Sequence, residues 1–177
     1  MFAFFILGVV FLLIICVLWT AIEHFRLGVP FIPTPKPVIQ EMIDLARMNG
    51  DETVVDLGAG DARFCIIAKR RYPHTRVIGY EVVPTVWLLG KIRIWLSGED
   101  IEWKMEDAMT ADLSSVNVIF LYVASEMMAR LEKKFKQELK MGTKIVSHVF
   151  RLRDKIRIRE KVVRCNHQDK TIIMYEW

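Results

Sequence analysis

The chain opens with an apolar segment that no charged residue interrupts. Residues 2–22 are Phe, Ile, Leu, Val and smaller side chains with one Trp, and at about 1.5 Å per residue they span roughly the 30 Å hydrocarbon core of a bilayer. A cleaved signal peptide would carry a basic start and a small-residue cleavage site, and this segment has neither. A core helix of so small a domain would rarely be apolar on every face. The pattern predicts an uncleaved transmembrane anchor over residues 1–24.

Proline dominates the segment that follows, residues 25–37. Within residues 29–37 every second or third position is proline, which favours an extended, semi-rigid linker. The only charges that flank the anchor lie on this side. The positive-inside rule therefore places the remaining domain, residues 38–177, on the cytosolic or matrix-like side of a membrane.

Helical and strand periodicities alternate through this domain. They predict helices over residues 38–48, 62–72, 85–96 and 125–140, and strands over residues 53–57, 76–80, 101–104, 116–122 and 144–150. Residues 155–164 and 171–176 suggest a final antiparallel hairpin. The expected fold class is α/β, a Rossmann-like doubly wound parallel sheet that ends in an antiparallel hairpin and is preceded by one transmembrane helix.

Two glycines and an acid follow the first two strands. Gly58 and Gly60 allow a tight turn and a close approach of the backbone to a ligand. Glu81 ends the next strand about twenty positions later, where an acid can accept both ribose hydroxyls. Asp56 sits where a pyrophosphate loop avoids negative charge, and Arg63 stands where a dinucleotide pattern has Gly or Ala. These features favour S-adenosylmethionine over a dinucleotide.

The string from Val54 to Asp61 resembles motif I of the class I, seven-β-strand methyltransferases. Glu81 resembles their ribose-binding acid, and Asp107 their acid beside the adenine. The resemblance covers nearly all of the part after the anchor and implies S-adenosylmethionine as cofactor. The cofactor-binding residues it implies are Asp56, Gly58, Ala59, Gly60, Asp61, Glu81 and Asp107.

A narrower resemblance is to the small membrane-anchored lysine methyltransferases of the ATP synthase c-subunit and adenine nucleotide translocase type, with their prokaryotic relatives. It is carried by the anchor with residues 29–33 after it, by residues 56–63, and by the helix that starts near Met127-Met128 and leads into residues 144–147. The family usually has glycine where Ala62 stands, and here only a short link follows the fifth strand. The resemblance implies a protein lysine, in or near a membrane, as acceptor.

No unique catalytic base can be named. Tyr122, Ser125 and Glu126 follow the fourth strand, and His148 lies on the fifth. Tyr122 and His148 can equally be packed strand residues, and Glu126 a first-turn acid that stabilises its helix. Tyr122 and Glu126 are therefore predicted only to line the site. Arg63 can reach a carboxylate or stay solvated, and Asp61 can cap its helix, bind the cofactor, or do both.

Charge and cysteine content limit the metals and macromolecules that we expect the protein to bind. Cys16, Cys65 and Cys165 show no metal or redox spacing, so no metal is expected. Lys155, Arg157, Arg159 and Lys161 alternate along a predicted strand, which suits a protected sheet edge or a surface for anionic headgroups or an acidic protein. Basic residues are not interleaved with aromatic ones, so nucleic acid is not expected.

Three functional hypotheses remain at the level of sequence. The first is a membrane-anchored S-adenosylmethionine-dependent protein-lysine N-methyltransferase. The second is the same chemistry on a lipid, a quinone or another small membrane-borne acceptor. The third is a tethered module that binds the cofactor without catalysis. The residues do not indicate an oligomeric state.

Overall fold

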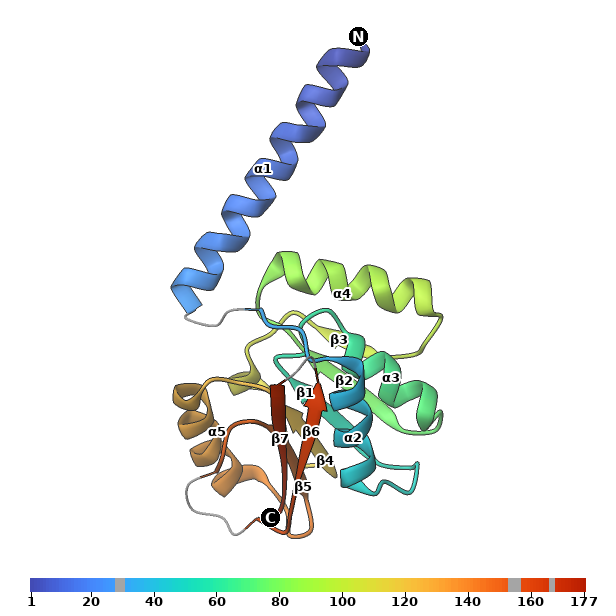
Figure 1. The fold of residues 1–177 in the computed structure, drawn as a ribbon, viewed down its shortest axis with the longest axis vertical. Helices are drawn as coiled ribbons and strands as arrows, with labels where there is room; N and C mark the ends of the chain where they lie inside the picture. The colour runs from blue at the N-terminus through green and yellow to red at the C-terminus, as the bar shows by residue number, and fades with distance from the viewer. Residues whose placement is uncertain (28–30, 153–156, 166–167) are drawn as a thin grey trace.

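A seven-stranded sheet forms the centre of the protein in a computed structural model that describes residues 1–27, 31–152, 157–165 and 168–177 (Figure 1). Its strand order is β3-β2-β1-β4-β5-β7-β6. The strands are β1 (Thr53–Leu57), β2 (Arg76–Tyr80), β3 (Glu102–Lys104), β4 (Val118–Leu121), β5 (Lys144–His148), β6 (Arg159–Cys165) and β7 (Gln168–Glu176). The first five run parallel, whereas β7 pairs antiparallel with both β5 and β6. The predicted fold class is confirmed.

Helices α2 (Lys36–Ala46), α3 (Arg63–Arg71), α4 (Pro84–Ser97) and α5 (Ser125–Glu138) cover the two faces of this sheet, and a short 3-10 turn η1 lies at Ala108–Thr110. A further helix, α1 (Phe2–Leu27), precedes them. One apolar cluster joins α2, α3 and α4 to one sheet face, and a second joins α5 to the other. Alternate residues of β1 point into different clusters: Val54 into the first, Val55 into the second. Burial on both faces explains why the central strands are almost wholly apolar.

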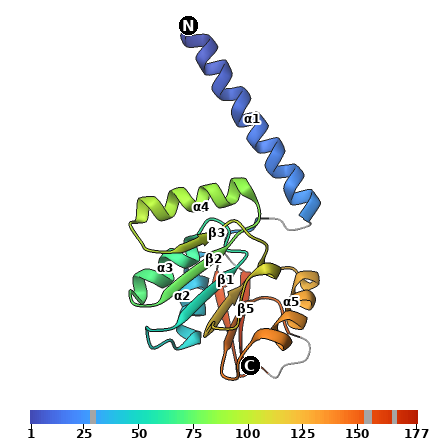
Figure 2. The ribbon, with the colours of Figure 1, turned by 180° about the vertical axis from the view of Figure 1, so that it is seen from behind.

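The helix α1 projects away from the domain, whereas α4 lies across the side of the domain that faces α1 (Figures 1 and 2). Residues Phe4–Ile22 form a 19-residue stretch of α1 that is long and apolar enough to cross a membrane, and none of it is buried. The Thr20 hydroxyl donates a hydrogen bond of 2.7 Å to the Thr85 hydroxyl of α4. The expected apolar helix is therefore present, and its C-terminal part meets α4.

Trp103 of β3 fixes α4 to the sheet. A Cβ added at Gly79 of β2 would lie 2.3 Å from the indole ring, and a Cβ at Gly90 of α4 would also lie 2.3 Å from it. The indole N–H donates to the Trp87 carbonyl oxygen at 2.9 Å. Only glycine at these two positions leaves room for the ring, so α4 sits close to the sheet.

Several predicted boundaries were wrong. The helix expected at residues 38–48 begins at Lys36, because proline is tolerated in the first helical turn. It ends at Ala46 rather than at Asn49-Gly50, whose N–H groups bind the Glu52 carboxylate at 2.6 and 2.8 Å. The helix expected at residues 125–140 ends at Glu138. Such shifts of one or two residues at element ends are common.

The predicted basic strand was wrong in its extent. β6 begins at Arg159, so Arg157 precedes it, and Lys155 lies outside the described residues. Lys161 donates to Glu41 of α2, and Arg157 pairs with Glu160. β6 is the terminal strand of the sheet, which agrees with the interpretation of this segment as a charged, protected edge.

Candidate functional site

A cavity of about 210 Å³ opens at the carboxyl ends of β1, β2 and β4. In an open parallel sheet this edge is the usual place for a ligand. The sequence-predicted cofactor residues all line this one cavity, although they come from three separate segments: Asp56, Gly58, Ala59, Gly60, Asp61, Glu81 and Asp107. The structure therefore brings together the whole predicted set.

The glycine loop turns sharply after β1. Gly58 has φ +81° and Gly60 has φ +59°, a left-handed region that residues with a Cβ rarely adopt. The N–H groups of Gly58 and Ala59 both donate to the Tyr80 carbonyl oxygen, at 3.0 and 2.8 Å. The loop is thus fastened to the end of β2, where Glu81 begins the next segment.

Glu81 is a buried acid held by two backbone donors. Its Oε2 accepts from the Gly60 N–H at 2.9 Å, and its Oε1 accepts from the Val83 N–H at 2.8 Å. Each carboxylate oxygen can accept more than one hydrogen bond. Glu81 is therefore fixed in orientation at the cavity wall, where a ribose-binding acid was expected.

Asp56 lies at the buried end of β1, close to a second acid. Burial, followed by the negative charge of Glu81 and that of Asp61, raises the pKa of Asp56 to about 8. The Cys65 thiol lies 3.9 Å from the Asp56 carboxylate, and burial together with the charge of Asp56 raises the pKa of this thiol. A cation brought into the cavity would favour the ionised form of Asp56.

Asp61 does not cap the helix that follows it, contrary to one of the predicted roles. α3 begins after Ala62, and no side chain in the described part of the chain caps it. Instead Asp61 binds Arg63, with Nε and Nη2 at 2.8 and 2.6 Å, and Arg93 of α4, with Nη1 at 2.6 Å. Burial acts to raise the pKa of Asp61, but the hydrogen bonds and charge of Arg63 and the charge of Arg93 outweigh it, so the pKa is lowered. Asp61 therefore links the loop to α4.

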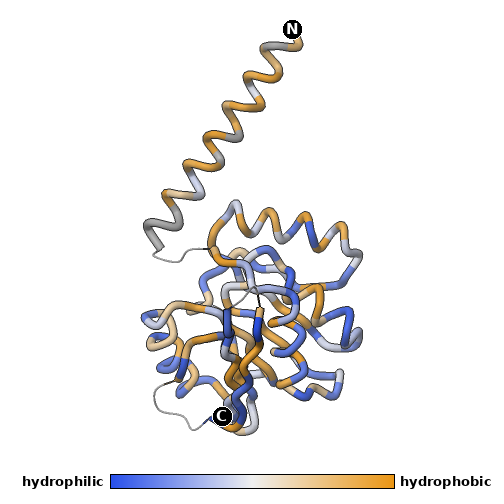
Figure 3. Tube along the Cα trace, in the orientation of Figure 1, coloured by the Kyte–Doolittle hydropathy of each residue, from blue (hydrophilic) through white to orange (hydrophobic). Residues whose placement is uncertain are grey.

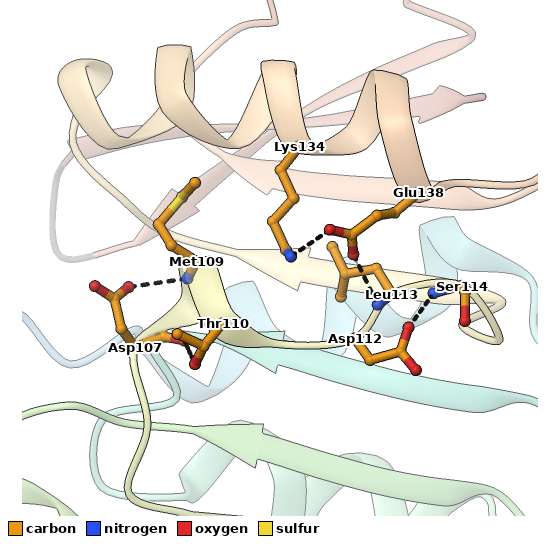
Figure 4. A network of polar contacts seen from close by, with 8 residues as sticks. All are labelled: Asp107, Met109, Thr110, Asp112, Leu113, Ser114, Lys134 and Glu138. Atoms are coloured by element: carbon orange, nitrogen blue, oxygen red, sulfur yellow. Dashed lines mark hydrogen bonds and ion pairs between the residues drawn. The ribbon is translucent and has the colours of Figure 1, made fainter.

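Asp107 ends the segment that follows β3. Its carboxylate accepts from the Met109 N–H at 2.9 Å and so caps the short turn η1 (Figure 4). The next segment is held to α5, because Glu138 accepts from the Leu113 N–H at 3.2 Å and from Lys134 at 2.6 Å. The cap fixes Asp107 at the cavity wall, where an adenine-binding acid was expected.

The linker supplies a wall of the cavity that was not predicted. Phe31, Ile32, Pro33 and Thr34 all line it. A Cβ added at Gly60 would lie 2.7 Å from the Phe31 ring, so the ring packs directly on the glycine loop. Arg63 reaches back to the Thr34 carbonyl oxygen at 3.4 Å. The proline pattern indicated an extended segment, but no local signal shows which surface such a segment crosses.

The candidate acceptor-side residues separate in the structure. Tyr122 lines the cavity, as predicted. Glu126 does not: it is exposed in the first turn of α5, and its neighbour Met127 lines the cavity instead. The predicted lining role of Glu126 is therefore wrong. His148 is 1% exposed and borders a smaller hollow next to Tyr122.

The cavity fits S-adenosylmethionine. The turn at Gly58 and Gly60 places loop backbone at the cavity wall, Glu81 offers fixed acceptor oxygens, and Asp56 can balance a positive charge. The cofactor would be held by these residues together with Asp107. Strand order, glycine loop and acids together define a class I S-adenosylmethionine-dependent methyltransferase.

Comparison with known proteins identifies the family. A family model described as the ANTKMT methyltransferase domain matches residues 56–159, and the chain belongs to this family. A crystal structure of an RNA methyltransferase from Salinibacter ruber in complex with S-adenosyl-L-homocysteine is similar, with a TM-score of 0.74 and 28% identity over 82% of this chain and 93% of that one. The tRNA methyltransferase TrmK of B. subtilis shares the fold, with a TM-score of 0.66 and 12% identity over 83% of this chain and 67% of that one.

Curated relatives are named as lysine methyltransferases. The protein-lysine N-methyltransferase of Saccharolobus islandicus (strain REY15A) is 29% identical over 71% of this chain and 79% of its own length. The mouse adenine nucleotide translocase lysine N-methyltransferase is 28% identical over 72% of this chain and 56% of its own. The human lysine N-methyltransferase of the ATP synthase c-subunit is 25% identical over 69% and 52%. The chain thus spans about half the length of these two mammalian relatives.

Proposed function

We propose that this protein is a membrane-anchored enzyme that transfers a methyl group from S-adenosylmethionine to the side-chain nitrogen of a lysine in a membrane or membrane-associated protein. The lysine acceptor is supported by the names of the relatives, among them lysine methyltransferases of the ATP synthase c-subunit and of adenine nucleotide translocase. The single observation that carries the location is the cavity wall formed by residues 31–34. These residues follow closely after α1, so chemistry in the cavity takes place beside the end of that helix.

The apolar helix α1 supports the membrane anchor. Its stretch Phe4–Ile22 contains no charged residue and none of it is buried in the domain. A soluble protein would leave this surface in water at a large cost, because each buried CH₂ contributes about 0.8 kcal/mol. Insertion of α1 into a bilayer removes that cost, with the domain on the cytosolic or matrix-like side.

Methyl transfer requires little covalent chemistry from the protein itself. Bound S-adenosylmethionine supplies a methyl group on a positively charged sulfur that is ready for in-line displacement. A lysine with its ordinary pKa near 10.4 must lose a proton first, which costs about 4 to 5 kcal/mol at neutral pH. Apolar wall residues such as Phe31, Val123 and Met127 lower this cost, because a dry environment disfavours the ammonium form.

The remaining task is alignment. The Glu81 carboxylate and the Gly60 N–H fix the donor end of the cavity, and the Tyr122 hydroxyl offers a hydrogen bond to an incoming amine at the wall. Holding donor and acceptor in a reactive geometry replaces a bimolecular encounter and can supply several kcal/mol of the barrier. No covalent enzyme intermediate is needed.

The test is transfer of labelled methyl groups from S-adenosylmethionine into native membranes by the full chain, followed by separation of protein from lipid. Label in protein that hydrolysis recovers as methylated lysine is the expected result. Label confined to lipid or small molecules would instead support the second hypothesis, a membrane-borne small acceptor. Cofactor binding without any transfer would support the non-catalytic module.

A matched pair of variants tests the cofactor site itself. Glu81→Gln should weaken S-adenosylmethionine binding about tenfold or more, which is about 1.4 kcal/mol, because it replaces an acceptor oxygen by a donor. Glu126→Gln makes the same chemical change at an exposed position outside the cavity. Calorimetry on the full chain in detergent should show unchanged affinity for the second variant. Equal affinities for all three proteins would contradict the assignment of Glu81.

A further inference from the structure

The helix α4 exposes an apolar surface that the fold does not cover. Its inner residues Val86, Gly90 and Ile94 are buried against the sheet. Its outer residues are also large and apolar, and we call them the outer α4 face: Leu88, Leu89, Ile92, Trp95 and Leu96. Trp95 is 79% exposed and Leu96 70%. A helix that is apolar on both faces is usually buried on both, so the outer α4 face calls for a second apolar environment.

Other helices of the domain do not share this property. The exposed positions of α5 are all polar or charged: Ser125, Glu126, Arg130, Lys133, Lys136 and Gln137. The exposed positions of α3 are the arginines Arg70 and Arg71. In the hydropathy colouring, apolar residues recur along α1 and along α4 (Figure 3). The outer α4 face is therefore a local feature of one side of the domain.

That side is the one next to the apolar helix α1. Thr20, near the C-terminal end of the stretch Phe4–Ile22, binds Thr85 in the first turn of α4 at 2.7 Å. If this stretch spans a bilayer, Thr20 lies near the membrane surface, and α4 starts at the same level. Both views place α4 on the side of the domain toward α1 (Figures 1 and 2).

The composition of α4 favours lipid over water or an acidic protein. Its sequence contains no acidic residue, and its two basic residues are Lys91 and Arg93. Lys91 is exposed beside the outer α4 face, where a long cationic side chain can reach lipid headgroups while its stem covers apolar surface. Exposed tryptophan is typical of the boundary between headgroups and acyl chains. Helices of this kind lie in the plane of the membrane surface.

We propose that the outer α4 face docks onto the bilayer surface beside α1 and forms a second membrane contact of the domain. This inference rests on the proposed membrane insertion of α1. It also orients the site, because Val83 and Val86 at the start of α4 line the cofactor cavity and Arg93 binds Asp61 of the glycine loop at 2.6 Å. Docking of α4 holds the cavity at a fixed height and tilt relative to the membrane.

Tryptophan fluorescence of the full chain in liposomes tests this contact. The lipids are a mixture of zwitterionic and anionic phospholipids that carry bromine on the acyl chain near the headgroup, which quenches nearby indole rings. Subtracting the spectrum of Trp95→Phe from that of the wild type isolates the emission of Trp95. We expect loss of most of this emission in brominated lipid compared with unbrominated lipid.

Two matched variants serve as internal references. Trp19→Phe isolates a tryptophan of α1, and Trp177→Phe isolates one that packs against Phe135 in the second apolar cluster, with ring centroids 6.0 Å apart. Trp19 emission should be quenched and Trp177 emission should not. Quenching of Trp19 without quenching of Trp95 would overturn the docking of α4 and leave the anchor in place. Absence of quenching at Trp19 would overturn membrane insertion itself.

A second measurement covers the other occupants of this surface. If Trp95 is shielded from a water-soluble quencher but not quenched by brominated lipid, a protein or a second copy of the chain covers α4, and lipid docking is wrong. Lys91→Glu should reduce Trp95 quenching in liposomes with anionic lipid, whereas Lys133→Glu on α5 should leave it unchanged. An equal effect of both substitutions would also overturn the proposal, since it would reflect net charge alone.

Discussion

The ring of Tyr122 lies against the imidazole of His148, with ring centroids 4.2 Å apart. Tyr122 belongs to the cavity wall, whereas His148 is buried behind it at the end of β5. Within the described residues neither ring nitrogen of His148 has a hydrogen-bond partner. Burial, followed by the positive charge of Lys170, lowers the pKa of His148 to about 4. The imidazole is therefore neutral at physiological pH and acts as a packed ring behind Tyr122.

His148 should make the fold sensitive to acid. Its folded pKa of about 4 lies below the ordinary value of 6.5. Between pH 4 and pH 6.5, His148 is therefore protonated in the unfolded chain but neutral in the folded chain. Stability is thus highest above pH 6.5 and falls as pH drops toward 4, by at most about 3 kcal/mol. His148→Phe should remove this part of the loss. Denaturant unfolding at several pH values in detergent measures it, and an unchanged profile would contradict the prediction.

Asp56 should couple cofactor binding to pH. Because its pKa is raised to about 8, most of the free enzyme holds this proton at neutral pH. A bound cationic cofactor favours the carboxylate, so binding should release up to one proton near pH 7 and tighten as pH rises toward 8. Calorimetry in buffers of different ionisation enthalpy measures the proton count. Asp56→Asn should bind with no pH dependence in this range, and proton release by the variant would exclude Asp56 as the source.

The same group should lower stability as pH rises. The folded chain holds the Asp56 proton between its ordinary pKa of 3.8 and its raised value of about 8, whereas the unfolded chain has lost it. The contribution is present below 3.8 and is lost as pH rises to about 8. Cofactor-free Asp56→Asn should therefore gain stability relative to wild type as pH increases from 6 to 8. A constant difference between the two proteins would show that Asp56 ionises normally.

Gly60 should be intolerant of a side chain for steric reasons. A Cβ there would lie 2.7 Å from the Phe31 ring and would sit on a backbone with φ +59°. Gly98 has a similar φ of +71°, but among the described residues no atom lies within 4 Å of an added Cβ. Gly98→Ala should cost about 1 to 2 kcal/mol of stability from strain alone and leave cofactor affinity unchanged. Gly60→Ala should lose stability and affinity, and Phe31→Ala in the same chain should restore part of the stability.

Ala62 carries backbone strain. Its φ is +64° and its side chain is fully buried. In Ala62→Gly the relief of about 1 to 2 kcal/mol is offset by the lost methyl burial of about 0.8 kcal/mol and by about 0.5 to 1 kcal/mol of chain entropy. The free energy of unfolding should therefore change by less than about 1 kcal/mol. Ala59→Gly, at a buried loop position without positive φ, has no strain to relieve and should be clearly destabilising.

Much of the fold could be predicted from sequence because its signals are local. Alternating apolar runs indicated five parallel strands and the hairpin, and Gly58, Gly60 and Glu81 marked the cofactor end of the sheet. Their meeting at one cavity follows from parallel topology, since the carboxyl ends of such strands share an edge.

The missed features depend on contacts between distant segments. No periodicity shows that Phe31 packs on Gly60 or that Lys161 reaches Glu41. Glu126 and Met127 are neighbours in one helical turn, and only the final orientation of α5 decides which of them lines the cavity. The sequence of α4 likewise does not show which of its apolar residues face the sheet, because the contact of Trp103 with Gly90 decides this.

The contact between Phe31 and the glycine loop also limits the distance between the cavity and the end of α1. Only three residues separate Leu27, the last residue of α1, from Phe31, and a chain of that length extends at most about 14 Å. With α1 in a bilayer, the catalytic cavity would stay close to the membrane surface, because Phe31 is part of the cavity wall and follows shortly after the end of α1. The enzyme would then select lysines by their distance from the membrane surface. A lysine on a free peptide would therefore be a poorer substrate than the same lysine in a membrane protein.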